Sequence, residues 1–199
     1  MSSIATTQSE ANHSLDIGLA FKRAWGLFVK DIAPLLIGAL IAGVLSVLTV
    51  GILAGPLFAG LYGMVIGRVR DGRQPHVGDV FAGFERFWSY FAAALVLVVL
   101  IGLASLTIVG GFLLATIWIY VFPLMVDRGM GLSEAMRTSK DMVMKAGFWD
   151  HLALIVIGFV IAAAVPGVLT VLTTPFLIVA VTAAYYLVEG KDEELANAC

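Results

Sequence analysis

Residues 32–67 read IAPLLIGALIAGVLSVLTVGILAGPLFAGLYGMVIG, and this stretch decides the fold. It contains no Asp, Glu, Lys, Arg, His, Asn or Gln. A single helix of this length would run about 55 Å, nearly twice the roughly 30 Å hydrocarbon core of a bilayer. We therefore expect a hairpin of two membrane-spanning helices, with Gly51, Gly55 and Pro56 near its turn.

Two further stretches, 88–126 and 152–188, also lack charged and amide side chains, and each is long enough for a second and a third hairpin. Their expected turns are Gly110-Gly111 and Thr173-Thr174-Pro175. The sequence thus predicts an all-α integral membrane protein with six transmembrane helices in three hairpins.

Composition supports a membrane location. The chain is 60% hydrophobic and 13% charged, with a mean hydropathy of +0.99, whereas soluble domains are about 25% charged. The net charge of −2 provides no basic surface for nucleic acid, so that partner class is set aside.

A polar, amphipathic segment precedes each hairpin, which gives a pattern repeated three times at intervals of about sixty residues. The first begins near Ile17, the second has Asp79 as its expected N-cap, and the third has Ser133 as a possible cap. The first and third favour helices lying in the membrane interface. The second, which is short and contains Gly83, fits an interfacial helix and, equally well, an extension of the following span or a packed connector.

These patterns define one membrane domain with two polar ends. Residues 1–16 are predicted to be a disordered polar tail, residues 17–188 the single six-helix domain, and residues 189–199 an acidic cytoplasmic tail. The first 16 residues lack the basic start and apolar middle of a cleavable signal, so we expect the first span to serve as an uncleaved insertion signal. Cys199 is expected to be a free thiol.

Charge placement predicts the topology. All 12 Lys and Arg residues lie before, between or after the three apolar stretches, and the 14 acidic residues lie in the same regions. With six spans these regions share one side, which the positive-inside rule makes cytoplasmic. Both termini are then cytoplasmic, and Trp25, Trp88 and Trp149, near the hairpin starts, are expected interfacial anchors.

Small residues recur every four positions along the first hairpin, a spacing that lets helix backbones approach closely in lipid. The expected helix-packing residues are Gly38, Ala42 and Ser46 on the first span and Gly51, Gly55, Ala59, Gly63 and Gly67 on the second. Their partner is either the adjacent span or another subunit.

Catalytic candidates are confined to the predicted cytoplasmic rim. They are His76, Asp79, Asp127 and His151, which could form a site only if the fold brought them together. The sequence carries no metal-ligand spacing, phosphate-binding glycine loop or nucleophile elbow, so we predict neither an enzyme nor a metal or other cofactor. Because the spans hold no ionisable residue, ion-coupled transport is also disfavoured.

Three segments resemble a broad family of small bacterial polytopic membrane proteins, which includes the membrane domain fused to some glycerophosphodiester phosphodiesterases. The matching segments are AWGLFVKDIAPLL at 24–36, GPLFAGLYGMVIGRVRDGRQPHVGDVFAGFERF at 55–87 and FPLMVDRGMGLSEAMRTSKDMVMKAGFWDHL at 122–152. The resemblance implies multiple spans and a location in the bacterial inner membrane, and it supplies no catalytic residues.

We therefore expect a non-enzymatic scaffold, assembly or accessory subunit whose partners are membrane lipids and other membrane subunits or copies of itself. Two alternatives stay open: a passive carrier or path for a lipid or small neutral solute, and a membrane-shaping protein whose hairpins do not fully cross.

Overall fold

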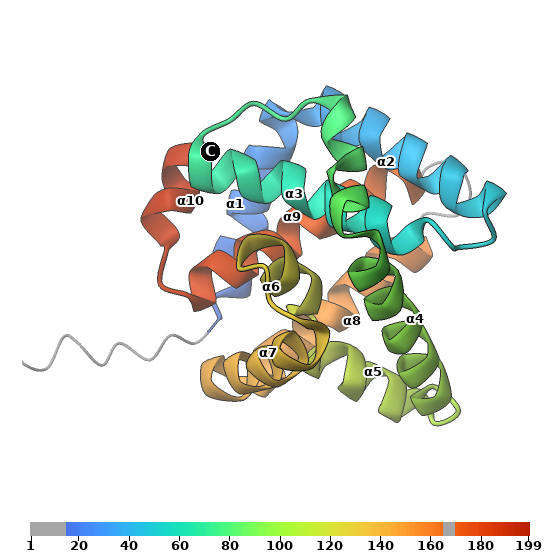
Figure 1. The fold of residues 1–199 in the computed structure, drawn as a ribbon. Helices are drawn as coiled ribbons and strands as arrows, with labels where there is room; N and C mark the ends of the chain where they lie inside the picture. Colours follow the sequence, from blue (N-terminus) through green and yellow to red (C-terminus); the bar gives the residue numbers. More distant parts are fainter. Residues whose placement is uncertain (1–14, 165–169) are drawn as a thin grey trace, which may run out of the picture.

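The computed structural model describes residues 15–164 and 170–199, and within them it shows helices joined by turns, without strands (Figure 1). The elements are α1 (Ile17–Lys30), α2 (Ile32–Leu48), α3 (Ala54–Asp71), the 3₁₀ helix η1 (Val77–Arg86), α4 (Phe87–Ala104), α5 (Ile108–Ile117), α6 (Val121–Asp127), α7 (Leu132–Ala146), α8 (Phe148–Ala164), α9 (Thr170–Val188) and α10 (Asp192–Ala198). The prediction of an all-α fold is confirmed for these residues.

Two helical stretches are long and apolar enough to cross a membrane, Val77–Ala104 and Val109–Asp127. The number rises to four if α1 with α2, and α7 with α8, each count as one bent span. The described residues therefore form a helical membrane protein with two to four candidate spans. These stretches do not by themselves define the finer arrangement of six spans in three hairpins.

The first and third amphipathic segments become separate helices that turn sharply from the apolar helices they precede, whereas the second, η1, continues into α4 as one helical stretch, Val77–Ala104. The bend is 91° between α1 and α2 and 107° between α7 and α8. Asp16 caps α1 by accepting a hydrogen bond from the Leu19 N–H at 2.9 Å. The helix α7 begins at Leu132, so its N-cap is Gly131 rather than Ser133.

The turns of the hairpins lie only partly where the sequence pattern suggests. The first reverses direction between Leu48 and Ala54 and includes Gly51, as expected. The second turns at residues 105–107, and Gly110-Gly111 lie within α5. Residues 173–175 are helical within α9, with Pro175 inside the helix, so no turn occurs there.

The central element is α3, which is surrounded by α2, η1, α4, α6 and α9. Eleven of its residues are buried. Glycines permit the closest contacts: a Cβ at Gly60 would lie 2.0 Å from the Val80 carbonyl oxygen, and one at Gly83 would lie 2.0 Å from the Pro56 carbonyl oxygen. The backbones of α3 and η1 therefore touch directly.

The predicted acidic tail is a folded part of the domain. Residues 192–198 form α10, which packs against α1, α3 and α9, and Leu195 is fully buried. Lys30 Nζ donates to the Ala198 carbonyl oxygen at 3.1 Å, which ties the tail to the end of α1.

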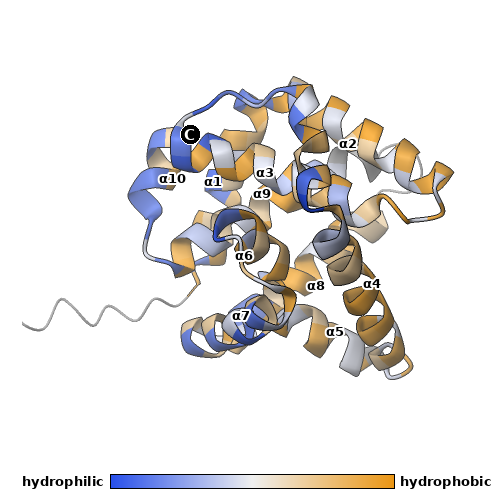
Figure 2. Ribbon diagram, viewed as in Figure 1, coloured by the Kyte–Doolittle hydropathy of each residue, from blue (hydrophilic) through white to orange (hydrophobic). Residues whose placement is uncertain are grey.

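Hydropathy divides the molecule. Figure 2 shows hydrophilic residues gathered on α7, α10 and the connection after α3, whereas α2, α4, α5 and α8 are largely hydrophobic. Large apolar side chains on these four helices are exposed, including Val98 at 70% and Phe159 at 59%. An apolar surface of this extent is typical of contact with lipid.

We predict that replacing Gly60 or Gly83 by Ala destabilises the fold, because the new methyl group would overlap a backbone carbonyl that cannot move aside without shifting a helix. Overpacking of this kind costs about 1–3 kcal/mol or more. Thermal unfolding in detergent measures the effect. The control is Gly102→Ala on α4, where a Cβ meets nothing within 4 Å; this variant should unfold at the same or a higher temperature. Equal stability of all three variants would contradict the close backbone contact.

Candidate functional site

A break in the apolar segment between α5 and α6 marks the polar centre of the molecule. The helix stops at Ile117 and resumes at Val121. Ser139 of α7 bridges the gap: its hydroxyl accepts from the Tyr120 N–H at 3.2 Å and donates to the Ile117 carbonyl oxygen at 2.8 Å. Trp118, Ile119 and Val121 donate their N–H groups to backbone carbonyls at the break, so Ser139 supplies the partner of the remaining Tyr120 N–H, which would be costly to leave unpaired in an apolar environment.

His151 lies beside the break and is fully buried. Its Nδ1 is 2.7 Å from the Gly147 carbonyl oxygen, and its Nε2 is 2.8 Å from the Tyr120 hydroxyl. A carbonyl only accepts, so Nδ1 carries the proton and Nε2 accepts from Tyr120. The imidazole thus holds the corner between α7 and α8 against α6.

Asp127 lies at the end of α6 and is held by two other elements. Its Oδ2 accepts from the Tyr185 hydroxyl at 2.9 Å, and its Oδ1 accepts from Arg70 Nη1 at 3.4 Å. The rings of Tyr120 and Tyr185 are 5.8 Å apart. A continuous series of contacts therefore joins His151 to Asp127 through two buried tyrosines.

His76 and Asp79 form a separate pair at the start of η1. Asp79 accepts from the His76 N–H at 3.0 Å and is 3.0 Å from Arg73 Nη1. Asp79 is the third residue of η1, not its N-cap, and completes a capping box with His76. The contacts made by both side chains are those of a helix start.

The four sequence candidates thus fall into two groups, and each has an evident structural role. Asp127 and His151 belong to the tyrosine-linked series, whereas His76 and Asp79 cap η1. The cavities described below are lined by other residues. Among the described residues, no three His, Cys, Asp or Glu side chains are grouped so that they could hold a metal ion.

Further ion pairs fasten the polar ends of the helices. Arg68 Nε is 2.9 Å from Asp31 Oδ2, and both side chains are only 12% exposed. Asp31 is the single residue between α1 and α2, so this pair fixes their corner to α3. Glu189, nearly buried, pairs with both Arg128 and Lys191.

Two groups outside the apolar helices have shifted acidities. The guanidinium of Arg70 lowers the pKa of the exposed Asp71 carboxyl through a side-chain hydrogen bond. Burial raises the pKa of the Cys199 thiol, whose Sγ lies 3.4 Å from the Arg23 carbonyl oxygen. The thiol is therefore less reactive near neutral pH than a fully exposed one.

The predicted anchors Trp25, Trp88 and Trp149 are exposed by 61%, 76% and 76%. Trp88 and Trp149 lie in the first turns of α4 and α8, and Trp25 packs edge-on against Phe176, with 6.1 Å between the ring centroids. Trp88 and Trp149 thus lie where a polar segment meets an apolar helix, whereas Trp25 lies within α1, and their role as interfacial anchors stays a prediction.

The small-residue positions mostly contact this same chain. A Cβ on Gly38 would be 3.3 Å from Leu61, and one on Gly63 would be 3.8 Å from Val126. The remaining positions are these: Gly55 lies against Tyr90, Ala59 against Gly83 and Gly67 against Arg73, Ala42 is buried, the Ser46 carbonyl oxygen accepts from the Gly51 N–H, and a Cβ at Gly51 would meet nothing within 4 Å.

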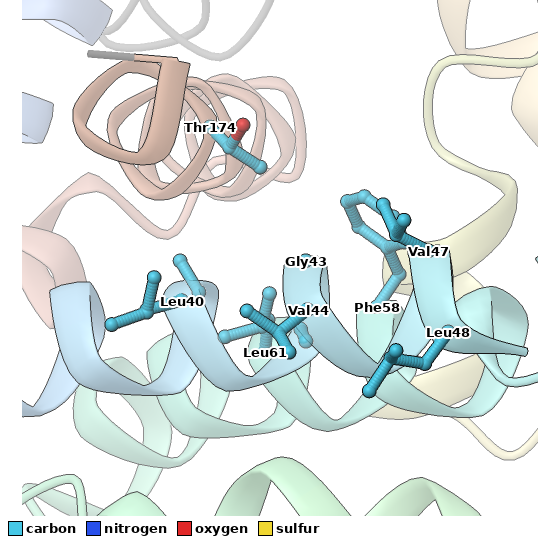
Figure 3. Close-up of a pocket in the computed structure, with 10 residues that line it drawn as sticks. Leu40, Gly43, Val44, Val47, Leu48, Phe58, Leu61 and Thr174 are labelled. Atoms are coloured by element: carbon cyan, nitrogen blue, oxygen red, sulfur yellow. The ribbon is translucent and has the colours of Figure 1, made fainter. Parts of the chain in front are cut away.

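Three apolar hollows lie between the helices. A groove of about 450 Å³ runs between α2 and α9 over α3 (Figure 3). Cavities of about 300 and 240 Å³ flank α8, one toward α5 and the other toward α9, and both are lined by Ile155 and Phe159.

Sequence reasoning missed Gly60, Ser139 and the tyrosines. Gly60 lies one position beyond Ala59 of the four-residue repeat, facing η1. Ser139 is one of several hydroxyls on an amphipathic helix, and its role depends on a break in another element. The paired Tyr185-Tyr186 near a span end was the one visible signal that polar groups meet there.

The chain shows no significant match to any protein-family model, curated protein or solved structure.

We predict that Ser139→Ala destabilises the protein by about 1–3 kcal/mol, because it leaves the buried Tyr120 N–H without a partner. Unfolding in detergent measures the stability, and hydrogen exchange at the Tyr120 amide should accelerate. Ser133→Ala, on the exposed face of the same helix, is the matched control and should change stability by less than about 0.5 kcal/mol. If Ser139→Ala behaves like its control, the hydroxyl bridge does not support the break.

Proposed function

We propose that this chain is a non-enzymatic membrane protein that serves as a scaffold, assembly or accessory subunit in the bacterial inner membrane. The observation that carries the proposal is that, among the residues that the structure describes, some charged side chains pair with one another inside the fold, whereas others are exposed and unpaired. Those near the apolar core are engaged within the fold, in the Asp31–Arg68, Arg70–Asp127 and Arg128–Glu189 pairs. Groups used in this way position helices rather than substrates.

The placement in the membrane is part of the proposal. Six spans in three hairpins would comprise α2 with α3, α4 with α5 and α6, and α8 with α9. The sharp bends before α2 and α8 would then put α1 and α7 in the interface plane. The exposed tryptophans support a position of α1 and α7 at the headgroup level of the membrane. The one-sided distribution of polar residues supports cytoplasmic termini.

The hairpin tips test this topology. Val50 and Leu106 are 91% and 85% exposed and lie at the two described turns. In a Cys199→Ser background, a cysteine at either tip should react with an impermeant maleimide added outside spheroplasts. A cysteine at Ser133, on α7, should react only after permeabilisation. Tips that stay unreactive from both sides would contradict crossing and favour the membrane-shaping alternative.

The surface offered to a partner is the charged face of α7. Glu134, Arg137, Lys140 and Asp141 are exposed, and no ion pair within the described part of the chain includes any of them. This face contrasts with the paired charges of Asp31, Asp127 and Glu189 nearer the core. We assign it as the contact surface for a cytoplasmic or interfacial part of another subunit.

Reversing Arg137 and Lys140 to Glu should remove a partner that cross-links to the wild-type protein in native membranes, because the partner's charges would then be repelled. Cross-linking followed by purification in mild detergent gives the measurement. The control is Lys22→Glu on α1, also exposed, which should leave the complex intact. A wild-type protein that purifies as a lone monomer without cross-linked partners would overturn the scaffold proposal.

A second candidate, a passive carrier for a lipid, draws support from the apolar cavities on both sides of α8. Hollows open toward lipid could admit part of an apolar solute. Transfer of a fluorescent phospholipid between vesicles would separate this function from scaffolding, which predicts no transfer.

A further inference from the structure

The groove between α2 and α9 is formed by small residues on α2. Ala39, Ala42 and Gly43 line it together with Phe58 and Leu61 of α3, and Figure 3 shows Gly43 on the side of α2 that faces Thr174 of α9. A Cβ at Gly43 would meet nothing within 4 Å. The hollow therefore exists because the α2 side chains are short, and its volume of about 450 Å³ is within the about 300–1,000 Å³ of ligand sites.

The lining determines what the groove can hold. Among the described residues that line it, all side chains are hydrocarbon apart from Thr174 on α9, which carries a hydroxyl. No charged residue occurs between residues 32 and 67. A water molecule needs two to four polar partners, so this wall favours an uncharged, apolar occupant.

The groove is long and opens onto the surface that faces lipid. Its α2 wall extends from Ala39 to Leu48, about 14 Å along a helix axis. Its rim consists of Leu40, Val44 and Val47, which are 49%, 50% and 79% exposed. These residues continue directly into the apolar surface of α2, so an occupant can enter from the bilayer.

Size separates the possible occupants. A helix with side chains is about 10–12 Å across, so a 14 Å segment from a second copy fills roughly 1,100 Å³. That is more than twice the volume of the groove. A single hydrocarbon chain is narrower and lies lengthwise.

We propose that the α2–α9 groove binds one acyl chain of a membrane phospholipid. The lipid fills the space between α2 and α9 and acts as part of the packing of the first hairpin against the last. This site is independent of the scaffold function and of its α7 surface, so each can fail without the other.

The test uses a phosphatidylethanolamine with a diazirine in one acyl chain, present in trace amounts in phosphatidylethanolamine–phosphatidylglycerol vesicles containing the full chain. Photolabelling should concentrate on residues 39–48, several-fold above the lipid-facing residues 95–103 of α4. Gly43→Leu should remove this excess and leave α4 labelling unchanged, because a Cβ at Gly43 meets open space and the larger side chain takes up volume in the groove.

Gly102→Leu is the matched control. It makes the same change on a helix where a Cβ also meets nothing within 4 Å, and labelling of α2 should remain as in the wild type. If Gly43→Leu does not fold, Val47→Trp at the rim replaces it. The proposal would be overturned by equal labelling of α2 and α4, or by an excess on α2 that survives in both groove variants. It would also be overturned if a diazirine fatty acid labelled α2 and the diazirine phospholipid did not, or if α2 cross-linked to α2 of a second copy.

Discussion

A helix that breaks or turns in an apolar environment frees backbone groups and must find them new partners, and this constraint organises the whole molecule. Ser139 meets it at the break between α5 and α6. The Thr49 hydroxyl meets it at the first hairpin tip, where it donates to the Leu45 carbonyl oxygen at 2.7 Å and accepts from the Leu53 N–H at 3.3 Å. Polar side chains thus occur where the helices are interrupted.

Polar contacts also hold the two sharp bends, between α1 and α2 and between α7 and α8. Asp31 is held by Arg68, and Gly147 is held by His151, so each amphipathic helix has a fixed direction relative to the apolar helix that follows it. Removing one partner from a nearly buried pair costs more than the pair contributes, since the remaining charge is left unpaired. Such pairs specify geometry more than they stabilise it.

Much of the helical content and polarity of the fold was predictable from the sequence. Uncharged stretches, amphipathic segments and tryptophans at their junctions are local features, and the structure has helices and exposed tryptophans at those places. The contacts between elements were less accessible. A four-residue repeat defines one face of α3, but α3 has neighbours all round, and its tightest contact is made by Gly60 on another face.

The docking of α1 against α9 has a consequence for biogenesis. Phe28 and Trp25 pack on Phe176, so the first helix of the domain obtains its aromatic packing partner from the last apolar helix. During synthesis α1 emerges long before the helix that supplies Phe176, so Phe28 and Trp25 can make this contact only after α9 has followed. The first helix of the domain therefore reaches its final packing only when nearly all of the described chain has been made.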